Sequence, residues 1–327
     1  MKHISILVPE SAVLAAVDDP RHMFAEINHF MTAAGKPPLF NIQLVGMSRE
    51  VRLHEGKYSV HTDALLNEVR RTDLVFIPAL AGDMLLALDQ NKEMIPWIIE
   101  QYENGAEIVS LCVGAFMLAE TGLLNGRQCS THWMYSNEFR DRYPEVKLVD
   151  DRIITEEERL YTSGGATSYW NLLLYLVEKY TDRATAILAA KIFAIELDRN
   201  SQSPFMIFNA QVKHNDEPVK RAQEFIEKNF EEKITVAQLA AMVSIGRRNF
   251  ERRFKKATSN TVVEYMQRVK MEAAKKNFET SMKNVSEVMY DVGYSDIKAF
   301  RTIFRKVTGL SPVEYRNKYN KMTVGQF

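Results

Sequence analysis

The sequence has 327 residues, of which 46% are hydrophobic and 26% charged, and its formal net charge at pH 7 is zero. This length supports two domains with separate cores, and the composition excludes a disordered or fibrous chain. Apolar runs nowhere reach eighteen residues, so we expect no membrane-spanning helix. Cys112 and Cys129 are the only cysteines, which excludes a disulfide framework and suits a reducing cytoplasm. No Cys/His cluster has metal-ligand spacing, and we expect neither a metal nor a cofactor.

The zero net charge hides an uneven distribution along the chain. From Lys213 onward there are 23 Lys and Arg against 14 Asp and Glu, whereas the residues before it hold 19 and 28. A basic segment joined to an acidic one indicates a polyanionic partner for the basic segment. Basic surfaces are also often only solubilising, so the charge excess alone does not distinguish a DNA-binding segment from a solvated one.

Residues 1–197 alternate short apolar runs with amphipathic stretches. The start of the chain, MKHISILVPESAV, lacks a signal-peptide cleavage site and favours a first strand. The compact runs rich in β-branched residues predict buried parallel strands at Ile4–Val8, Ile42–Val45, Leu74–Ile77 and Ile108–Leu111. The periodic stretches predict helices at Met23–Met31, Asn91–Asn104, Trp170–Tyr180 and Ala184–Leu197. This alternation predicts an α/β domain, a flavodoxin-like sandwich with a mostly parallel sheet flanked by helices.

A cysteine lies where a predicted strand runs into a helix. Cys112 directly follows the strand predicted at Ile108–Leu111. In α/β enzymes such a sharp turn exposes a nucleophile, and a helix N-terminus lowers the pKa of a thiol. His132 follows in the run Ser130-Thr131-His132-Trp133 and is expected near the thiol. Cys129 shows no comparable context, and we expect it to be a buried small residue.

The stretch 198–217 interrupts the periodicity with polar residues and Pro204, and we interpret it as a linker between domains at 1–197 and 218–327. We expect the apolar Phe205–Phe208 cluster within it to dock on a neighbouring surface. From Pro218, which suits a first helical position, only helical patterns follow, so the second domain is predicted to be all-α.

The second domain contains an internal repeat with an offset of about fifty residues. The repeated stretches are Phe250-x-x-x-Phe254-Lys255-Lys256-x-Thr258 with Phe300-x-x-x-Phe304-Arg305-Lys306-x-Thr308, Thr261-Val-Val-Glu264-Tyr265 with Ser311-Pro-Val-Glu314-Tyr315, and, at an offset of 49, Leu239 and Val243 with Val288 and Val292. Two copies of one helical unit therefore lie in tandem.

Each copy has the pattern of a helix-turn-helix. Thr235-x-x-Gln238 and Asn284-x-x-Glu287 are capping signatures that begin a short helix. Turns follow at Ser244-Ile-Gly246 and Gly293-Tyr294-Ser295, where Gly relaxes the backbone. The second helix of each unit then buries two phenylalanines spaced i, i+4.

The opposite face of each second helix carries the candidate DNA-binding residues. They are Arg247, Arg248, Asn249, Glu251, Arg252 and Lys255 in the first unit and Ser295, Lys298, Arg301, Thr302 and Arg305 in the second. Arg can fork onto guanine in the major groove, and Lys can neutralise phosphates. One charged helix face is usually only solvated, but two at equivalent places favour DNA binding. A helix from Thr261 to about Phe278, about 25 Å long, would hold the two second helices at a spacing near the ~34 Å between successive major grooves.

Residues 220–317 resemble the AraC/XylS family of bacterial regulators. The resemblance rests on Val292-Gly-Tyr-Ser-Asp…Ala299-Phe-Arg-x-x-Phe-Arg-Lys-x-x-Gly309-x-Ser-Pro312-x-x-Tyr-Arg316. It implies two recognition helices that begin near Gly246 and Ser295 and contact bases and phosphates. Ser259, Val262 and Met289-Tyr290 depart from the Gly, Pro and small residues usual there, which concerns local turn geometry rather than DNA binding.

The first domain resembles the class I glutamine amidotransferase-like superfamily, in the branch of intracellular protease I-like proteins, and more closely the sensor half of GlxA-type regulators. The matching stretches are Leu111-Cys-Val-Gly-Ala-Phe-x-Leu-Ala-x-Thr-Gly122-Leu-Leu-x-Gly126-Arg, Thr131-His132-Trp133 and Thr162-Ser163-Gly164-Gly165-Ala-Thr167. Enzymes of that superfamily pair the cysteine with a carboxylate, where this chain is expected to have His22. Catalysis, redox or electrophile sensing, and a packing role therefore all stay open for Cys112.

Together these features predict a cytoplasmic, sequence-specific DNA-binding transcription regulator. Its expected partners are double-stranded DNA, a small-molecule effector and a second copy of the chain, with no membrane. The first domain is expected to sense or dimerise without catalysis. The alternative is a cysteine-dependent hydrolase or amidase that uses Cys112 and carries an accessory helical domain.

Overall fold

The computed structural model describes residues 1–197, 201–208, 210 and 214–320. By their contacts the residues form two compact units, Met1–Gln202 and Ser203–Phe327. None of the helices in these described ranges combines the length and hydrophobicity that a membrane crossing requires.

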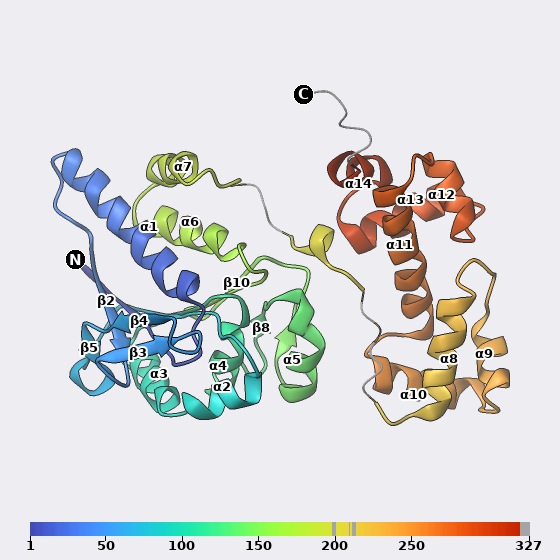
Figure 1. The fold of residues 1–327 in the computed structure, drawn as a ribbon, viewed down its shortest axis with the longest axis horizontal. Coiled ribbons are helices and arrows are strands. Elements are labelled where there is room, and N and C mark those ends of the chain that lie inside the picture. The colour runs from blue at the N-terminus through green and yellow to red at the C-terminus, as the bar shows by residue number, and fades with distance from the viewer. Residues whose placement is uncertain (198–200, 209, 211–213, 321–327) are drawn as a thin grey trace. The chain divides into compact units, whose positions relative to one another are not determined.

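The first unit is built on a seven-stranded sheet with the strand order β10-β11-β7-β6-β1-β2-β5 (Figure 1). Its neighbouring strands pair in parallel, except for the antiparallel pair β10 and β11 at one edge. The strands are β1 (Lys2–Leu7), β2 (Phe40–Gly46), β5 (Ala64–Leu65), β6 (Leu74–Ile77), β7 (Glu107–Ser110), β10 (Ile154–Glu157) and β11 (Leu160–Ser163). Every residue of β6 and β11 is buried, as expected for strands covered on both faces.

Helices cover both faces of this sheet. On one face α1 (Leu14–Ala33), α6 (Tyr169–Tyr180) and α7 (Arg183–Ile192) pack against one another, and on the other lie α2 (Met84–Gln90), α3 (Met94–Glu103) and α4 (Ala115–Glu120) (Figure 1). The remaining elements are the pair β3 (Glu50–Leu53) and β4 (Tyr58–His61), the pair β8 (Gln128–Cys129) and β9 (Lys147–Leu148), helix α5 (Ser136–Arg142), and the 3-10 turns η1 (Leu66–Glu68), η2 (Cys112–Gly114) and η3 (Trp133–Tyr135). The predicted α/β sandwich is confirmed.

The predicted strands of this unit are all present, but three helix boundaries were wrong. Helix α3 begins at Met94, three residues after the predicted start at Asn91. Helix α1 begins nine residues before Met23 and contains Pro20, because its polar Asp18-Asp19-Pro20 stretch hides the apolar face in the sequence. Helix α7 ends at Ile192, so the predicted extension to Leu197 is wrong. The short strands β3–β5 and β8–β11 were missed because none contains a long apolar run.

In the second unit every regular element from Glu217 to Tyr319 is a helix, and no strand occurs in this described stretch. The helices are α8 (Glu217–Lys228), α9 (Val236–Met242), α10 (Arg247–Thr258), α11 (Val262–Thr280), α12 (Val285–Asp291), α13 (Ile297–Thr308) and α14 (Pro312–Tyr319). They enclose two separate apolar cores, one around Phe250 and Phe254 and one around Phe300 and Phe304. Helix α11 is shared, since Val262 and Tyr265 lie in the first core and Met271 and Phe278 in the second.

The stretch 203–208, which we call the strap, packs on the helical unit. Its 3-10 turn η4 (Ser203–Phe205) contacts α13, and the hydroxyl of Tyr319 donates to the carbonyl of Pro204 at 3.0 Å. At its other end the ring of Phe208 packs edge-on against Tyr265 in the first core, with 5.2 Å between ring centroids. The surface on which this apolar cluster docks is therefore its own helical unit. The strap touches both cores.

Candidate nucleic-acid interface and cysteine turn

The internal repeat seen in the sequence is a structural repeat. Thr258 and Thr308 are both fully buried, and each hydroxyl donates at 2.8 Å to the carbonyl four residues earlier, of Phe254 and of Phe304. The phenylalanines of both units are fully buried in their cores, as predicted. Each helix-turn-helix copy therefore positions its second helix, α10 or α13, by the same contacts.

The helix starts are set by side-chain caps. Both predicted capping boxes are formed, by Thr235 with Gln238 at α9 and by Asn284 with Glu287 at α12. Helix α10 starts directly after Gly246. Helix α13 starts after Asp296, whose carboxylate accepts from the amide of Ala299 at 2.5 Å, so its cap lies one residue beyond the expected Ser295.

The two turns reach the same left-handed backbone with different residues. In the second turn Gly293 has φ 72°, and a Cβ there would lie 1.9 Å from the carbonyl oxygen of Glu231. In the first turn the left-handed residue is Ser244, with φ 56°, whereas Gly246 has φ −60°. The expectation that a glycine relaxes the first turn is therefore wrong, and Ser244 carries that strain.

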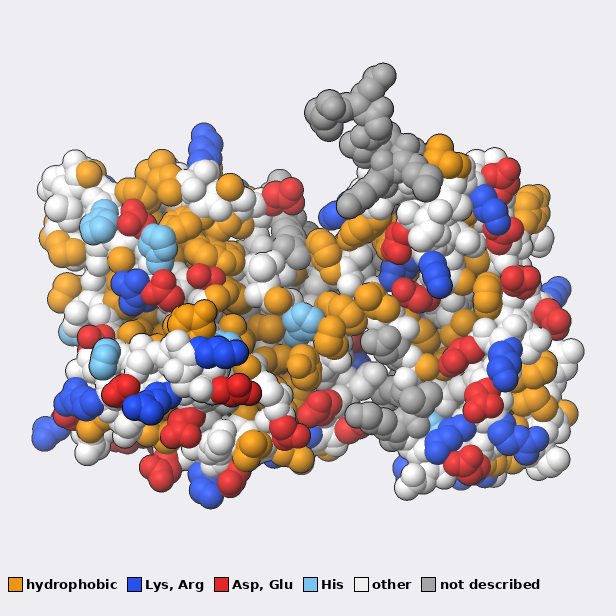
Figure 2. Space-filling model, in the orientation of Figure 1, with side chains coloured by type: hydrophobic (Ala, Val, Ile, Leu, Met, Phe, Trp, Pro, Cys, Tyr) orange, Lys and Arg blue, Asp and Glu red, His pale blue; other side chains and the backbone are white. Residues whose placement is uncertain are grey.

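The predicted contact residues of the first helix-turn-helix copy lie on α10 and face solvent. Arg247, Arg248, Asn249, Arg252 and Lys255 are exposed, and Glu251 is partly exposed. Two contacts within the helix preorganise this face: Arg247 lies 3.2 Å from the carboxylate of Glu251, and Arg252 donates to the amide oxygen of Asn249 at 2.9 Å. In Figure 2 basic side chains gather over the part of the helical unit that Figure 1 labels α8–α10.

The second face is exposed and lacks such internal pairs. Lys298, Arg301 and Arg305 on α13 are exposed, as is Ser295 just before the helix. No hydrogen bond or ion pair engages the charged groups of these three cations within the described part of the chain. The hydroxyl of Thr302 donates to the carbonyl of Lys298 at 2.8 Å and so is satisfied by its own helix.

Two further cations occupy equivalent places that the sequence reasoning did not single out. Lys256 and Lys306 are exposed in the last turns of α10 and α13, and the repeat itself was the signal that could have found them. Arg253, by contrast, is committed to Asp216, to which it donates two bonds of 2.7 and 2.8 Å. It is therefore a structural residue of α10.

Helix α11 separates the two helix-turn-helix copies. Figure 1 shows α10 and α13 at opposite ends of it. Its 19 residues make it about 28 Å long, two residues longer than predicted, and its capping box at Thr261 and Glu264 is formed. The length of this connecting helix is of the same order as the ~34 Å between successive major grooves on one side of a duplex.

In the α/β unit Cys112 occupies the sharp turn between β7 and α4. Its φ of 55° is left-handed, and Thr131 donates to its carbonyl at 3.2 Å. Gly114 allows the turn to lie against the end of β6, because a Cβ there would be 2.6 Å from the carbonyl oxygen of Pro78. The predicted strand-to-helix turn is confirmed.

The thiol in this turn is not exposed. Cys112 is 5% exposed, and burial raises its pKa to about 12, which a hydrogen bond from the backbone of Val113 only partly opposes. The expected lowering of the pKa is therefore wrong, because desolvation outweighs the helix N-terminus. Cys129 is fully buried as predicted, and burial raises its pKa to about 12 as well.

A carboxylate lies near this turn, but it is not at the position considered from the sequence. Tyr169 donates to the carboxylate of Asp19 at 2.6 Å. Burial, this bond and the neighbouring Cys112 thiol all raise the pKa of Tyr169, and burial raises the pKa of Asp19. His22 lies one helical turn further along α1, packed edge-on against Phe193. The carboxylate was missed because the start of α1 was placed too late.

His132 lies beside the turn without engaging the thiol. Its Nδ1 accepts from the amide of Met134 at 3.2 Å, and burial lowers its pKa. Among the described residues no hydrogen bond joins it to Cys112; the contact to the turn is made by its neighbour Thr131. No group of three potential metal ligands occurs among the described residues either.

Comparisons with known proteins agree with this two-part structure. The DJ-1/PfpI family matches residues 14–179, and a helix-turn-helix domain family matches residues 239–318. The HTH-type transcriptional regulators GbdR and CdhR of Pseudomonas aeruginosa are each 24% identical to the chain, over 82% of it and 72% of GbdR, and over 79% of it and 76% of CdhR. The crystal structure of an AraC family transcriptional regulator from Pseudomonas putida has the fold of the first unit, with a TM-score of 0.51 and 15% identity over 59% of this chain and 100% of that one.

These matches cover the α/β unit and the helical unit separately, and the two regulators span both. The chain therefore belongs to the DJ-1/PfpI family and, with an AraC-type helix-turn-helix domain in its second half, is a DNA-binding transcription regulator.

Proposed function

We propose that the chain reads a specific double-stranded DNA sequence by inserting α10 and α13 into successive major grooves. The observation that carries this is the pair of exposed cationic faces at equivalent places of two repeated units, one at each end of α11. Arginine on such a face can donate two bonds to guanine, and lysine can neutralise phosphates. The side chains proposed to contact DNA are Arg247, Arg248, Asn249, Glu251, Arg252, Lys255, Ser295, Lys298, Arg301 and Arg305.

The first unit is proposed to sense a small-molecule effector or to dimerise, without catalysing a reaction. Burial keeps the Cys112 thiol protonated at neutral pH, whereas a nucleophilic or redox-sensing cysteine acts as thiolate. The relatives that span both units are named as transcriptional regulators, which favours regulation over the hydrolase alternative. Action as a homodimer in the cytoplasm belongs to the same proposal, because two copies would read a doubled site.

DNA binding by the purified full-length chain tests this proposal. Binding to the region upstream of its own gene is expected to be specific and to weaken steeply with salt. Arg252→Ala and Arg301→Ala are each expected to weaken it by about 1–3 kcal/mol. The matched control is Arg221→Ala, an exposed arginine on α8 outside both faces. Equal affinity for that region and for unrelated DNA at low salt would refute the proposal.

The homodimer has its own test. Sedimentation at micromolar concentration, with and without the bound DNA, is expected to show a two-chain species. A single chain bound to each DNA fragment that carries one site pair would contradict it.

A further inference from the structure

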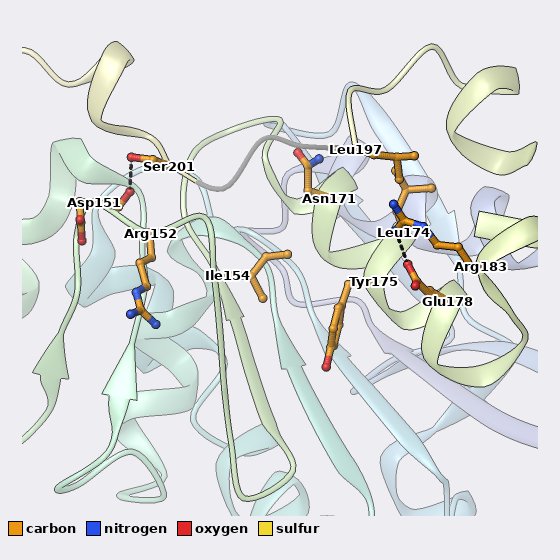
Figure 3. Close-up of a pocket in the computed structure, with 10 residues that line it drawn as sticks. All are labelled: Asp151, Arg152, Ile154, Asn171, Leu174, Tyr175, Glu178, Arg183, Leu197 and Ser201. Atoms are coloured by element: carbon orange, nitrogen blue, oxygen red, sulfur yellow. Dashed lines mark hydrogen bonds and ion pairs between the residues drawn. The ribbon is translucent and has the colours of Figure 1, made fainter. Parts of the chain in front are cut away.

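The first unit contains a cavity away from the cysteine turn. It has a volume of about 590 Å³, within the ~300–1,000 Å³ range of small-molecule sites. It lies between the stretch that leads into β10, the outer side of α6, the start of α7 and the end of the unit (Figure 3). The lining residues are Asp151, Arg152, Ile154, Asn171, Leu174, Tyr175, Glu178, Arg183, Leu197 and Ser201.

Most polar groups around the cavity already have partners. Arg183 pairs with Glu178 at 2.7 Å, and the amide nitrogen of Asn171 donates to the carbonyl of Glu196 at 2.6 Å. The hydroxyl of Tyr175 donates to the carboxylate of Glu156. These contacts hold one wall of the cavity in a defined shape without using a ligand.

Arg152 is different. Its backbone carbonyl accepts hydrogen bonds from Ser130 and Gln202, which hold the backbone at this residue in place. Its guanidinium forms no hydrogen bond or ion pair with any described residue. Figure 3 shows this side chain on one side of the cavity, Ile154 beside it and Tyr175 with the Arg183–Glu178 pair across from it. Arg152 is exposed, and its unpaired guanidinium lies at a cavity also lined by apolar Ile154, Leu174 and Leu197, where it can pair with a carboxylate that carries a short carbon chain.

The cavity also touches the residues with which the first unit ends. Ser201 pairs with Arg152 in an isolated bridge, and its hydroxyl donates to the carbonyl of Asp151 at 2.9 Å. The next residue, Gln202, donates to the carbonyl of Thr131 at 2.9 Å. From Ser203 onward the chain belongs to the helical unit and enters the strap. A ligand on Arg152 would therefore occupy a cavity that is also lined by Ser201, two residues before the start of the helical unit.

We propose that this cavity is a regulatory binding site for a small organic carboxylate, held by the guanidinium of Arg152. The regulatory part rests on the proposed function, whereas the binding part stands on the cavity alone. The bound ligand changes the stability of the contacts that Ser201 makes with Asp151 and Arg152. Through this connection it changes the affinity for DNA.

The test is isothermal titration of the full-length protein with straight-chain C3–C6 monocarboxylates and α-amino acids, each beside its primary amide. At least one carboxylate is expected to bind, and its amide about tenfold or more weakly, because only the carboxylate pairs with arginine. Arg152→Gln is expected to abolish this difference, whereas Arg70→Gln, an exposed arginine outside the cavity, is expected to retain it. Ile154→Phe, which fills the cavity beside an intact Arg152, is expected to weaken binding too.

Two results would overturn the binding site: no carboxylate of the set binds, or one binds equally to wild-type protein and to Arg152→Gln. DNA affinity measured with and without the binding carboxylate tests the regulatory part, and an unchanged affinity overturns it. Failure of the proposed function is recognised separately, because wild-type protein without ligand would then show no specific DNA binding at all.

Discussion

The ammonium of Lys275 lies 2.6 Å from the carbonyl oxygen of Met206, which joins the strap to the middle of α11. Only 5% of the Lys275 side chain is exposed, and its second partner is the carboxylate of Glu272 at 2.8 Å. Glu272 in turn accepts from the amide of Phe208 at 3.1 Å. A buried lysine needs such partners, so this network ties the strap to the helix shared by both cores.

Replacing this lysine should therefore loosen the helical unit. Lys275→Met is expected to destabilise it by about 2 kcal/mol, because the Met206 carbonyl and the Glu272 carboxylate lose their donor. Lys276→Met, at an exposed neighbouring position, is the matched control and should change stability little. Hydrogen exchange of peptides from α11 measures the change. Tryptophan fluorescence would not report on the helical unit, because all three tryptophans lie in the α/β unit. Equal protection in both variants would contradict the role of the network.

The turn at Gly293 should tolerate no side chain. Gly293→Ala is expected to cost about 3 kcal/mol, because a Cβ meets the Glu231 carbonyl and φ is positive. Gly246→Ala serves as the control, since a Cβ there has no atom within 4 Å. Urea unfolding followed by circular dichroism compares the two. If both variants unfold at the wild-type urea concentration, the close approach to Glu231 has been misjudged.

The two equivalent helix ends at Ser259 and Gly309 differ in strain. Both adopt the left-handed conformation, with φ 54° and 74°. Ser259→Gly is therefore expected to stabilise the helical unit by about 1 kcal/mol, and Gly309→Ser to destabilise it by a similar amount. The midpoints of urea unfolding measure both. Shifts of the same sign in the two variants would rule out backbone strain as the cause.

The bond between Arg253 and Asp216 predicts a pH dependence. The guanidinium hydrogen bond holds the pKa of Asp216 below its usual value of 3.8, with smaller contributions from the amide of Val219 and from His214. A carboxyl whose pKa is lower in the folded state stabilises that state above its unfolded pKa. This contribution is lost as pH falls through the folded pKa. The stability difference between wild-type protein and Asp216→Asn is thus expected to be constant from pH 7 to about pH 5 and to shrink below pH 4. A difference that grows on acidification would contradict it.

The cysteines should be unreactive in the folded protein. Because burial raises the pKa of Cys112 and Cys129 to about 12, neither forms appreciable thiolate at pH 8. A disulfide reagent such as Ellman's reagent is expected to react with both only after unfolding in urea. Cys112→Ser is the control, and it should halve the amount released after unfolding. Rapid reaction of one thiol in native wild-type protein, absent in Cys112→Ser, would show that the turn opens.

The sequence alone determined the elements whose signals are local. Capping pairs such as Thr235 with Gln238 involve neighbours three residues apart, and the phenylalanines of α10 and α13 show their buried face by helical spacing. The repeat added independent support, because two copies of a weak pattern at equivalent places are hard to explain by chance. The exposed cationic faces and the strand-to-helix turn at Cys112 were predictable for the same reason.

Only the tertiary structure decided which charges are free and which are engaged. Arg252 and Arg253 are adjacent in the sequence, yet one faces solvent and the other is held by Asp216, 37 residues away. The cavity at Arg152, the contact of Asp19 with Tyr169 and the burial of the Cys112 thiol likewise depend on residues distant in the chain. Desolvation and pairing are set by whatever packs against a group in space, and a sequence pattern reports only what lies near it along the chain.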